Sequence, residues 1–171
     1  MANGEKDGWV SFDDEIRNMP ETMERVQTDT REHMLLYFTS GTTGYPKMVV
    51  HNHRYALAHI QTAAHWQNVD PDGVHLTISD TGWGKAAWGK LFGQMSIGAC
   101  VFVYDFDKFI PTDMLRIMQN YKITSFCAPP TMFRFFIKEG LENYDLSSLK
   151  YSAIAGEALN PEVYNKWFEY T

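Results

Sequence analysis

The stretch ITSFCAPPTMFRFFIKEG, residues 123–140, decides the fold of this chain, because a strand and a helix meet in it at a sharp boundary. Residues 123–128 form a short apolar run that suits a strand, and Pro129 and Pro130 end it because proline cannot donate to a sheet ladder. Pro130 then stands early in a helix that Gly140 terminates. The stretch predicts one strand–helix unit of a layered α/β protein.

The same unit recurs outward along the chain. We expect strands over residues 74–79, 99–104 and 151–156, and helices over 85–98, 112–121 and 159–170. The run 99–104 is apolar on both faces, which is typical of an inner strand of a covered sheet. The last helix has Asn160 as its N-cap and Pro161 at its first position. Because strand and helix alternate four times from residue 74 on, the pattern predicts a three-layer α/β fold with a largely parallel sheet flanked by helices.

Length and charge narrow the class of protein. The 171 residues suit one domain, which we divide into a polar N-terminal segment, 1–33, and an α/β domain, 34–171. The formal net charge is −6, with no block of Lys and Arg, so neither nucleic acid nor an anionic membrane is expected as the main partner. No apolar run approaches the ~18 residues that span a bilayer, so no membrane span is expected.

The cysteines and the N-terminal residues indicate the cellular location of the protein. Cys100 and Cys127 both lie inside apolar runs, which predicts two buried, reduced thiols rather than a disulfide or a metal site. The start, MANGEKDGW, has no apolar core of a signal peptide. Together these features predict a cytoplasmic setting.

A polar loop, TSGTTGYPK, lies between the apolar runs 34–38 and 47–50, both of which suit strands. Its hydroxyl, glycine and lysine groups would suit a polyphosphate: Thr39, Ser40, Gly41, Thr42, Thr43, Gly44 and Lys47. A plain polar hairpin turn is the alternative that composition alone leaves open. A Walker loop is excluded by spacing, because the pattern here is G-x-x-G-x-x-K and a strand follows it.

The residues YFTSGTTGYPKMVVH resemble the phosphate-binding signature of the adenylate-forming enzymes, and Thr39 to Lys47 satisfy every position of that signature. Two further segments, SDTGWGKAAWGKLFGQMSIGACVFVYD and SLKYSAIAGEALNPEV, resemble this family in order and spacing. The resemblance runs from about Leu35 to the end. It is greatest to the acetyl- and medium-chain acyl-CoA synthetases, and it implies a subdomain of the family's large domain.

The resemblance also implies a chemistry. A small carboxylic acid would attack Mg²⁺-bound ATP to give an acyl-adenylate and pyrophosphate, and coenzyme A would then take the acyl group. By position, the loop residues would hold the phosphates, and Gly156, Glu157 and Ala158 would form the adenine platform. Asp80, Gly82, Trp83 and Gly84 would lie near the acyl or pantetheine channel. No residue of this chain is assigned as catalytic or as a metal ligand.

Family members are several times longer, so the resemblance implies a fragment that cannot complete adenylation by itself. The helix still running at Thr171 fits this expectation. The remainder of a synthetase chain would then be its partner, and an isolated piece would self-associate through uncovered apolar faces. Two alternatives stay open. One is an amino-acid adenylation domain, in which Asp80 would bind the amino group of the substrate. The other is a nucleotide-binding module without catalysis.

Histidines and aromatic residues have ordinary interpretations as well. The six histidines, among them His51 and His53, lack a carboxylate or cysteine at ligand spacing, so no metal site is expected. Trp83, Trp88 and Phe92 would suit either an acyl channel or helix packing.

Overall fold

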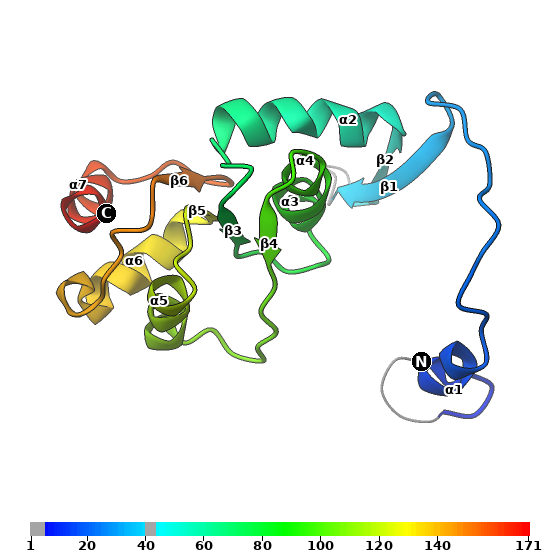
Figure 1. Ribbon diagram of the computed structural model, residues 1–171, viewed down its shortest axis with the longest axis horizontal. Helices are drawn as coiled ribbons and strands as arrows, with labels where there is room; N and C mark the ends of the chain where they lie inside the picture. Colours follow the sequence, from blue (N-terminus) through cyan, green and yellow to red (C-terminus); the bar gives the residue numbers. More distant parts are fainter. Residues whose placement is uncertain (1–5, 40–43) are drawn as a thin grey trace.

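A four-stranded parallel sheet forms the centre of the protein (Figure 1). The computed structural model describes residues 6–39 and 44–171. The strand order is β4-β3-β5-β6, with β3 Val74–Thr77, β4 Cys100–Phe102, β5 Ser125–Ala128 and β6 Tyr151–Ile154. The predicted α/β fold with a parallel sheet is confirmed.

Helices cover both faces of this sheet (Figure 1). One face carries α5 Pro111–Asn120, α6 Pro130–Glu139, the short turn η3 Leu141–Asn143 and α7 Pro161–Tyr170. The other face carries two helical runs. The first is α2 Arg54–Gln61, which continues into the π-helical turn η1 Thr62–Trp66. The second consists of α3 Gly84–Ala86, the π-helical turn η2 Ala87–Leu91 and α4 Phe92–Ser96. The result is three layers.

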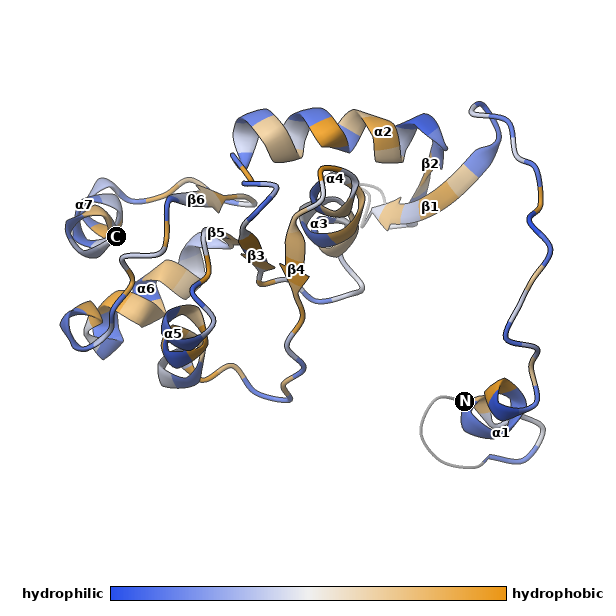
Figure 2. Cartoon of the chain, viewed as in Figure 1, coloured by the Kyte–Doolittle hydropathy of each residue, from blue (hydrophilic) through white to orange (hydrophobic). Residues whose placement is uncertain are grey.

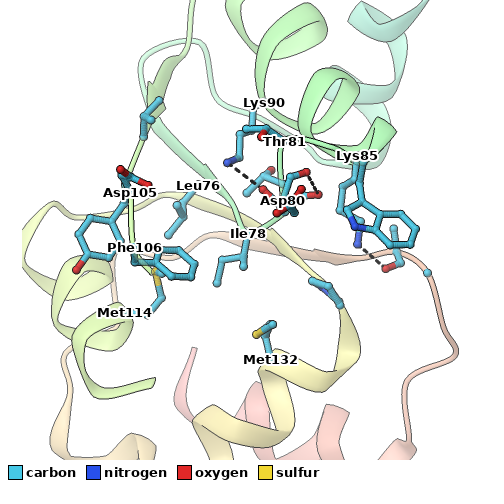
Figure 3. Close-up of a pocket in the computed structure, with 18 of the residues that line it drawn as sticks. Leu76, Ile78, Asp80, Thr81, Lys85, Lys90, Asp105, Phe106, Met114 and Met132 are labelled. Carbon is cyan, nitrogen blue, oxygen red and sulfur yellow. Dashed lines mark hydrogen bonds between the residues drawn. The ribbon is translucent and has the colours of Figure 1, made fainter. Parts of the chain in front are cut away.

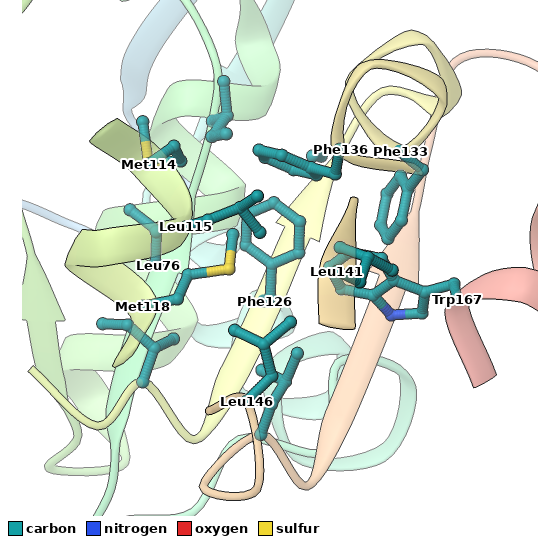
Figure 4. Close-up of a cluster of buried hydrophobic side chains, with 14 residues drawn as sticks. Leu76, Met114, Leu115, Met118, Phe126, Phe133, Phe136, Leu141, Leu146 and Trp167 are labelled. Carbon is teal, nitrogen blue, oxygen red and sulfur yellow. The ribbon is translucent and has the colours of Figure 1, made fainter. Parts of the chain in front are cut away.

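The face of the sheet under α5, α6 and α7 carries the main hydrophobic core (Figure 4). Leu76 of β3 and Phe126 of β5 are register partners and both are buried. Trp167 of α7 packs its ring 4.8 Å from that of Phe133 of α6, measured between centroids, and its Nε1 donates to Ser152 Oγ at 3.0 Å. Figure 2 shows the hydrophobic colour concentrated on the central strands, where both layers of helices meet them.

The opposite face of the same strands is polar but equally buried. His75 pairs in register with Ser125, and both are almost fully covered. The side chains of Gln67 and Gln94 are buried on this side of the molecule and hydrogen-bond to each other. Successive residues of a strand point to opposite faces, so β3 contributes side chains both to the apolar core on one face and to the polar layer on the other.

Helices α2 and α4 approach each other closely at Gly93. A side chain added at Gly93 would come within 2.1 Å of the carbonyl oxygen of His59 and 2.6 Å of Ala63 Cβ. Only glycine lets the two backbones approach this closely. Gly93 therefore fixes the distance between the two helices above the sheet.

An antiparallel hairpin precedes the sheet, formed by β1 His33–Thr39 and β2 Lys47–Asn52. Tyr37 of β1 packs against Tyr55 of α2, with ring centroids 6.2 Å apart, so the hairpin rests on the helical layer. Further upstream, α1 Phe12–Arg17 lies apart from the sheet and its helices (Figure 1). The two strands expected around the polar loop are confirmed.

Two expectations about strand β4 are wrong. It is an edge strand within the described residues, not an inner one, since only β3 pairs with it. Cys100 is accordingly exposed, whereas Cys127, on the inner strand β5, is buried as expected. Apolar residues on both faces of a short run indicated burial, but they carry no information about the edge on which the strand lies.

Candidate functional site

A pocket of about 930 Å³ lies at the carboxyl ends of all four parallel strands (Figure 3). The segments that follow β3, β4, β5 and β6 each contribute to its wall, through Asp80, Asp105, Pro129 and Gly156 respectively. In open α/β sheets, ligands bind in the crevice outside the carboxyl ends of the strands. The location of the pocket therefore follows from the topology.

Two of the predicted site segments meet at this pocket. Asp80 and Trp83, from the expected acyl or pantetheine segment, line it together with Gly156 and Glu157, from the expected adenine platform. More than seventy residues of sequence separate the two segments. Gly82, Gly84 and Ala158, from the same two segments, are not among the residues that line it.

Asp80 shapes the turn that leads from β3 into α3. Its Oδ1 accepts a hydrogen bond from the main-chain N–H of Gly82 at 2.7 Å, and its carbonyl accepts from the N–H of Trp83 at 3.0 Å. Asp80 thus makes its own local turn, as aspartate often does. Trp83 leaves this turn with 71% of its surface exposed, so its ring is available at the mouth of the pocket.

Two lysines on the helical run above the sheet also line the pocket (Figure 3). Lys85 Nζ donates to the carbonyl of Ala155 at 2.6 Å, and Lys90 Nζ donates to the carbonyl of Ser79 at 3.5 Å. Burial lowers the pKa of both ammonium groups. Sequence reasoning missed both lysines. The available signal was two lysines five residues apart in an otherwise apolar helix, KAAWGK.

The segment after β6 forms the opposite wall. Gly156 has a φ of +113°, a conformation that L side chains rarely adopt, so glycine suits this position for a conformational reason. Glu157 is exposed, and its Oε2 lies 3.9 Å from Arg134 Nη2 of α6. The carboxylate therefore faces solvent and the guanidinium of Arg134, and it also interacts electrostatically with the ammonium of Lys85.

The polar loop lies between the two strands of the hairpin. Thr39 and Lys47 are register partners at its base, both exposed, and Gly44 has a φ of +89°. The predicted phosphate contacts of Ser40, Gly41, Thr42 and Thr43 lie outside the described residues. The phosphate role of the loop stays a prediction.

Trp83, Trp88 and Phe92 were expected either to line an acyl channel or to pack between helices, and the structure shows both arrangements. Trp83 alone of the three lines the pocket. Trp88 stacks on His59 at 6.2 Å between centroids, and Phe92 contacts Tyr55 edge-on at 5.7 Å, so both pack between helices.

No group of three His, Cys, Asp or Glu side chains that could hold a metal ion occurs within residues 6–39 and 44–171. Over the same ranges, no helix has the length and apolar character to cross a membrane.

The architecture and the placement of the pocket define an α/β protein of the class that binds ligands at the ends of parallel strands. The model of the AMP-binding enzyme family matches residues 2–171. The chain therefore belongs to this family.

The chain is similar to several acyl-coenzyme A synthetases. It is 35% identical over 168 residues to acyl-coenzyme A synthetase ACSM3, mitochondrial, of Homo sapiens, a match that covers 98% of this chain and 29% of the relative. It is 37% identical over 162 residues to acyl-coenzyme A synthetase ACSM4, mitochondrial, of Rattus norvegicus, covering 94% and 28% respectively. The chain thus spans less than a third of the length of these curated relatives.

Solved structures agree with this assignment. The acyl-CoA synthetase of Brucella canis superimposes with a TM-score of 0.87 at 25% identity, over 98% of this chain and 30% of that protein. The anthranilate CoA ligase AuaEII, in complex with anthranoyl-AMP, superimposes with a TM-score of 0.85 at 27% identity, over 99% and 33%. The fold is that of the corresponding part of these enzymes.

The predicted cytoplasmic location is wrong by the same comparison. The human relatives ACSM3, ACSM4 and ACSM5 are all named as mitochondrial proteins. Reduced cysteines and an apolar-poor start had suggested the cytoplasm, but neither feature distinguishes between compartments whose thiols are kept reduced.

Proposed function

We propose that this chain is the nucleotide- and acid-binding part of an ATP-dependent acyl-CoA synthetase, an acid–thiol ligase. A carboxylic acid and ATP would give an acyl-adenylate and pyrophosphate, and coenzyme A would then take the acyl group as a thioester. One observation carries this proposal: Asp80 and Trp83 share a pocket with Gly156 and Glu157 at the carboxyl edge of the sheet, in a chain of the AMP-binding family.

The proposed ATP-binding residues lie in two places, the hairpin loop and the pocket. In the hairpin loop, Thr39, Gly44 and Lys47 would hold the ATP phosphates together with Ser40, Gly41, Thr42 and Thr43. Lys47 would supply positive charge where negative charge builds up on the departing pyrophosphate. At the wall of the pocket, Gly156 and Glu157, followed by Ala158, would support the adenine.

The acid would enter beside the turn made by Asp80, Gly82, Trp83 and Gly84. This wall offers an exposed indole and, on the helix behind it, the ammonium groups of Lys85 and Lys90. Mg²⁺ would arrive with the ATP phosphates, since this ion binds through substrate phosphates and few protein ligands. We assign no protein ligand to it.

The proposal is tested in the complete protein that contains these residues. Acid-dependent release of pyrophosphate from Mg²⁺-ATP is measured with a panel of short and medium carboxylic acids, and thioester formation is measured after coenzyme A is added. We expect turnover with at least one acid and a thioester product. Pyrophosphate release that no acid stimulates would overturn the proposal.

An amino-acid adenylation domain is the second candidate, because Asp80 lies at the pocket and could face an amino group. The bond from Gly82 N–H to its Oδ1 engages this carboxylate within its own turn, which favours the acyl substrate. Amino acids in the same panel separate the two: turnover with amino acids alone would favour the second candidate.

The 171 residues by themselves span about 29% of their relatives. We therefore expect the isolated segment to release no pyrophosphate, and we expect it to self-associate through apolar side chains that are exposed on β1 and β2, such as Phe38 and Met48. Light scattering over a dilution series measures the second expectation.

A further inference from the structure

The main-chain carbonyl of Gly89 is bound by two side chains of the strand beneath it. Gly89 lies in the π-helical turn η2 and is buried. Thr77 Oγ1 donates to its carbonyl oxygen at 2.6 Å, and His75 Nε2 lies 2.9 Å from the same oxygen. Both side chains come from β3, and each is at most 1% exposed.

The hydrogen-bond partners of the His75 ring indicate which of its nitrogens carries a proton. A carbonyl oxygen only accepts, so a proton on Nε2 of His75 suits its contacts to Gly89 O and to Thr77 Oγ1, 2.8 Å away, and leaves Nδ1 to accept from Ser125 Oγ at 2.8 Å. Burial lowers the pKa of His75 to about 4, so the imidazole is neutral near pH 7. Thr77 and His75 together form a rigid polar bracket, which we call the Gly89 bracket, between the sheet and the helix above it.

The helix cannot move closer to or along the strand without disturbing this bracket. A Cβ atom added at Gly89 would come within 3.2 Å of Thr77 Cγ2, so the helical turn packs tightly against this side chain. Single π-helical turns are rare and occur frequently at functional sites.

The residues on either side of Gly89 form one wall of the pocket. Lys85 and Lys90 come four residues before and one residue after it, and Trp83 starts the same run. All three line the pocket, and so does Thr77, although only 1% of its surface is exposed; His75, on the far side of the bracket, does not line it. A shift of η2 by a few tenths of an ångström would therefore change the shape of the acid end of the pocket.

We propose that Thr77, supported by His75, is a positioning residue that sets the selectivity of the pocket for the carboxylic acid by holding η2 in place. This inference rests on the proposed acyl-CoA synthetase function. Thr77 is almost fully covered and its hydroxyl is engaged by the Gly89 carbonyl, so it acts through Lys85, Lys90 and Trp83. The long side chain of Lys85 can keep its bond to Ala155 over such a small shift, so ATP binding is affected less.

Three variants of the complete protein test the proposal. Thr77→Val keeps the shape and removes the hydroxyl, and Thr77→Ser restores it. Thr124→Val is the matched control, because Thr124 Oγ1 also bonds to the main chain of another element: it lies 3.0 Å from Val74 N and 3.1 Å from Val74 O, at the opposite end of the sheet. All three receive the same two measurements: kinetics with a series of acids, and amide hydrogen exchange of residues 84–96.

In Thr77→Val we expect the KM for the acid to rise about fivefold to tenfold, the preferred chain length to change, and the KM for ATP to stay within about twofold. Exchange over residues 84–96 should accelerate. Thr77→Ser should restore both properties, and Thr124→Val should reduce stability without changing acid preference.

Unchanged exchange over 84–96 in Thr77→Val would overturn the proposed anchoring. Equal rises in both KM values, or the same kinetic change in Thr124→Val, would show a merely structural role and overturn the selectivity claim. A wild-type protein without acid-dependent pyrophosphate release would overturn the proposed function instead, and the exchange measurement would still decide the anchoring.

Discussion

The ammonium of Lys85 donates a 2.6 Å hydrogen bond to the carbonyl of Ala155, seventy residues further along the chain. The bond ties helix α3 to the segment after β6, and so joins the two walls of the pocket. Lys85 is partly buried, and that burial lowers its pKa. Any change that removes the ammonium leaves the Ala155 carbonyl without this donor, beside Gly156.

Lys85→Met keeps the aliphatic stem and removes the charge. Because both walls lose their connection, we expect kcat/KM for the acid and for ATP to fall about fivefold each in the complete protein. Steady-state pyrophosphate release measures this. Lys108→Met, at an exposed position, is the control and should leave both values unchanged. Equal kinetics in Lys85→Met and the wild type would contradict a structural role for the bond.

Lys47→Ala tests the phosphate loop. The proposed partner of Lys47 is the triphosphate, so we expect the KM for ATP to rise about tenfold or more while the KM for the acid changes little. Lys138→Ala, exposed on α6, controls for the loss of a surface charge. If both variants bound ATP equally well, the loop would be a plain turn.

Gly93→Ala tests the helix crossing. The added methyl group would overlap the carbonyl oxygen of His59, so the helices must separate, and we expect a loss of about 3 kcal/mol in the free energy of unfolding. Urea unfolding followed by tryptophan fluorescence measures it. Gly84→Ala is the matched control, because its added methyl would make only an ordinary contact, 3.6 Å from the ring of Tyr37. A variant Gly93→Ala as stable as Gly84→Ala would refute the close crossing.

His75 makes stability depend on pH. Burial lowers its pKa from 6.5 to about 4, against a smaller raising effect of the bond to Gly89. Between these values the unfolded chain binds more protons, so this contribution is complete above pH 6.5 and is lost as the pH falls towards 4. The loss should approach about 3 kcal/mol.

Urea unfolding at a series of pH values from neutral to acidic measures this loss. His75→Gln should flatten the dependence in this window, although it lowers stability overall. His33→Gln, at an exposed position, should keep the wild-type dependence. A wild-type curve without a decline in the window would show that His75 is not buried as a neutral group.

Local signals in the sequence predicted the elements well. Asn160 caps α7 by accepting from the N–H of Glu162 at 2.8 Å, and Pro161 follows at the first helical position, as its sequence indicated. Pro130 begins α6 and Gly140 ends it. These features depend on interactions between residues a few positions apart, so a single sequence contains the necessary information.

The site was predicted only in part, for a related reason. The segments around Asp80 and Gly156 could be identified as binding segments by their resemblance to a family, but nothing in the sequence indicated that Lys85 reaches Ala155. The buried side chain of His75 was likewise unremarkable in a strand pattern. Both bonds join residues of different elements, and their existence depends on how those elements are stacked.

The sequence by itself determined the kind of fold, the order of its strands and helices along the chain, and the family to which it belongs. Only the tertiary structure decided that β4 lies at an edge and exposes Cys100, that both lysines face the pocket, and that Thr77 and His75 contact the carbonyl of Gly89 in η2. The physical reason is the range of the interactions. Propensities and caps act within a few residues, whereas strand order and the close approach of helix to sheet come from packing between distant parts of the chain.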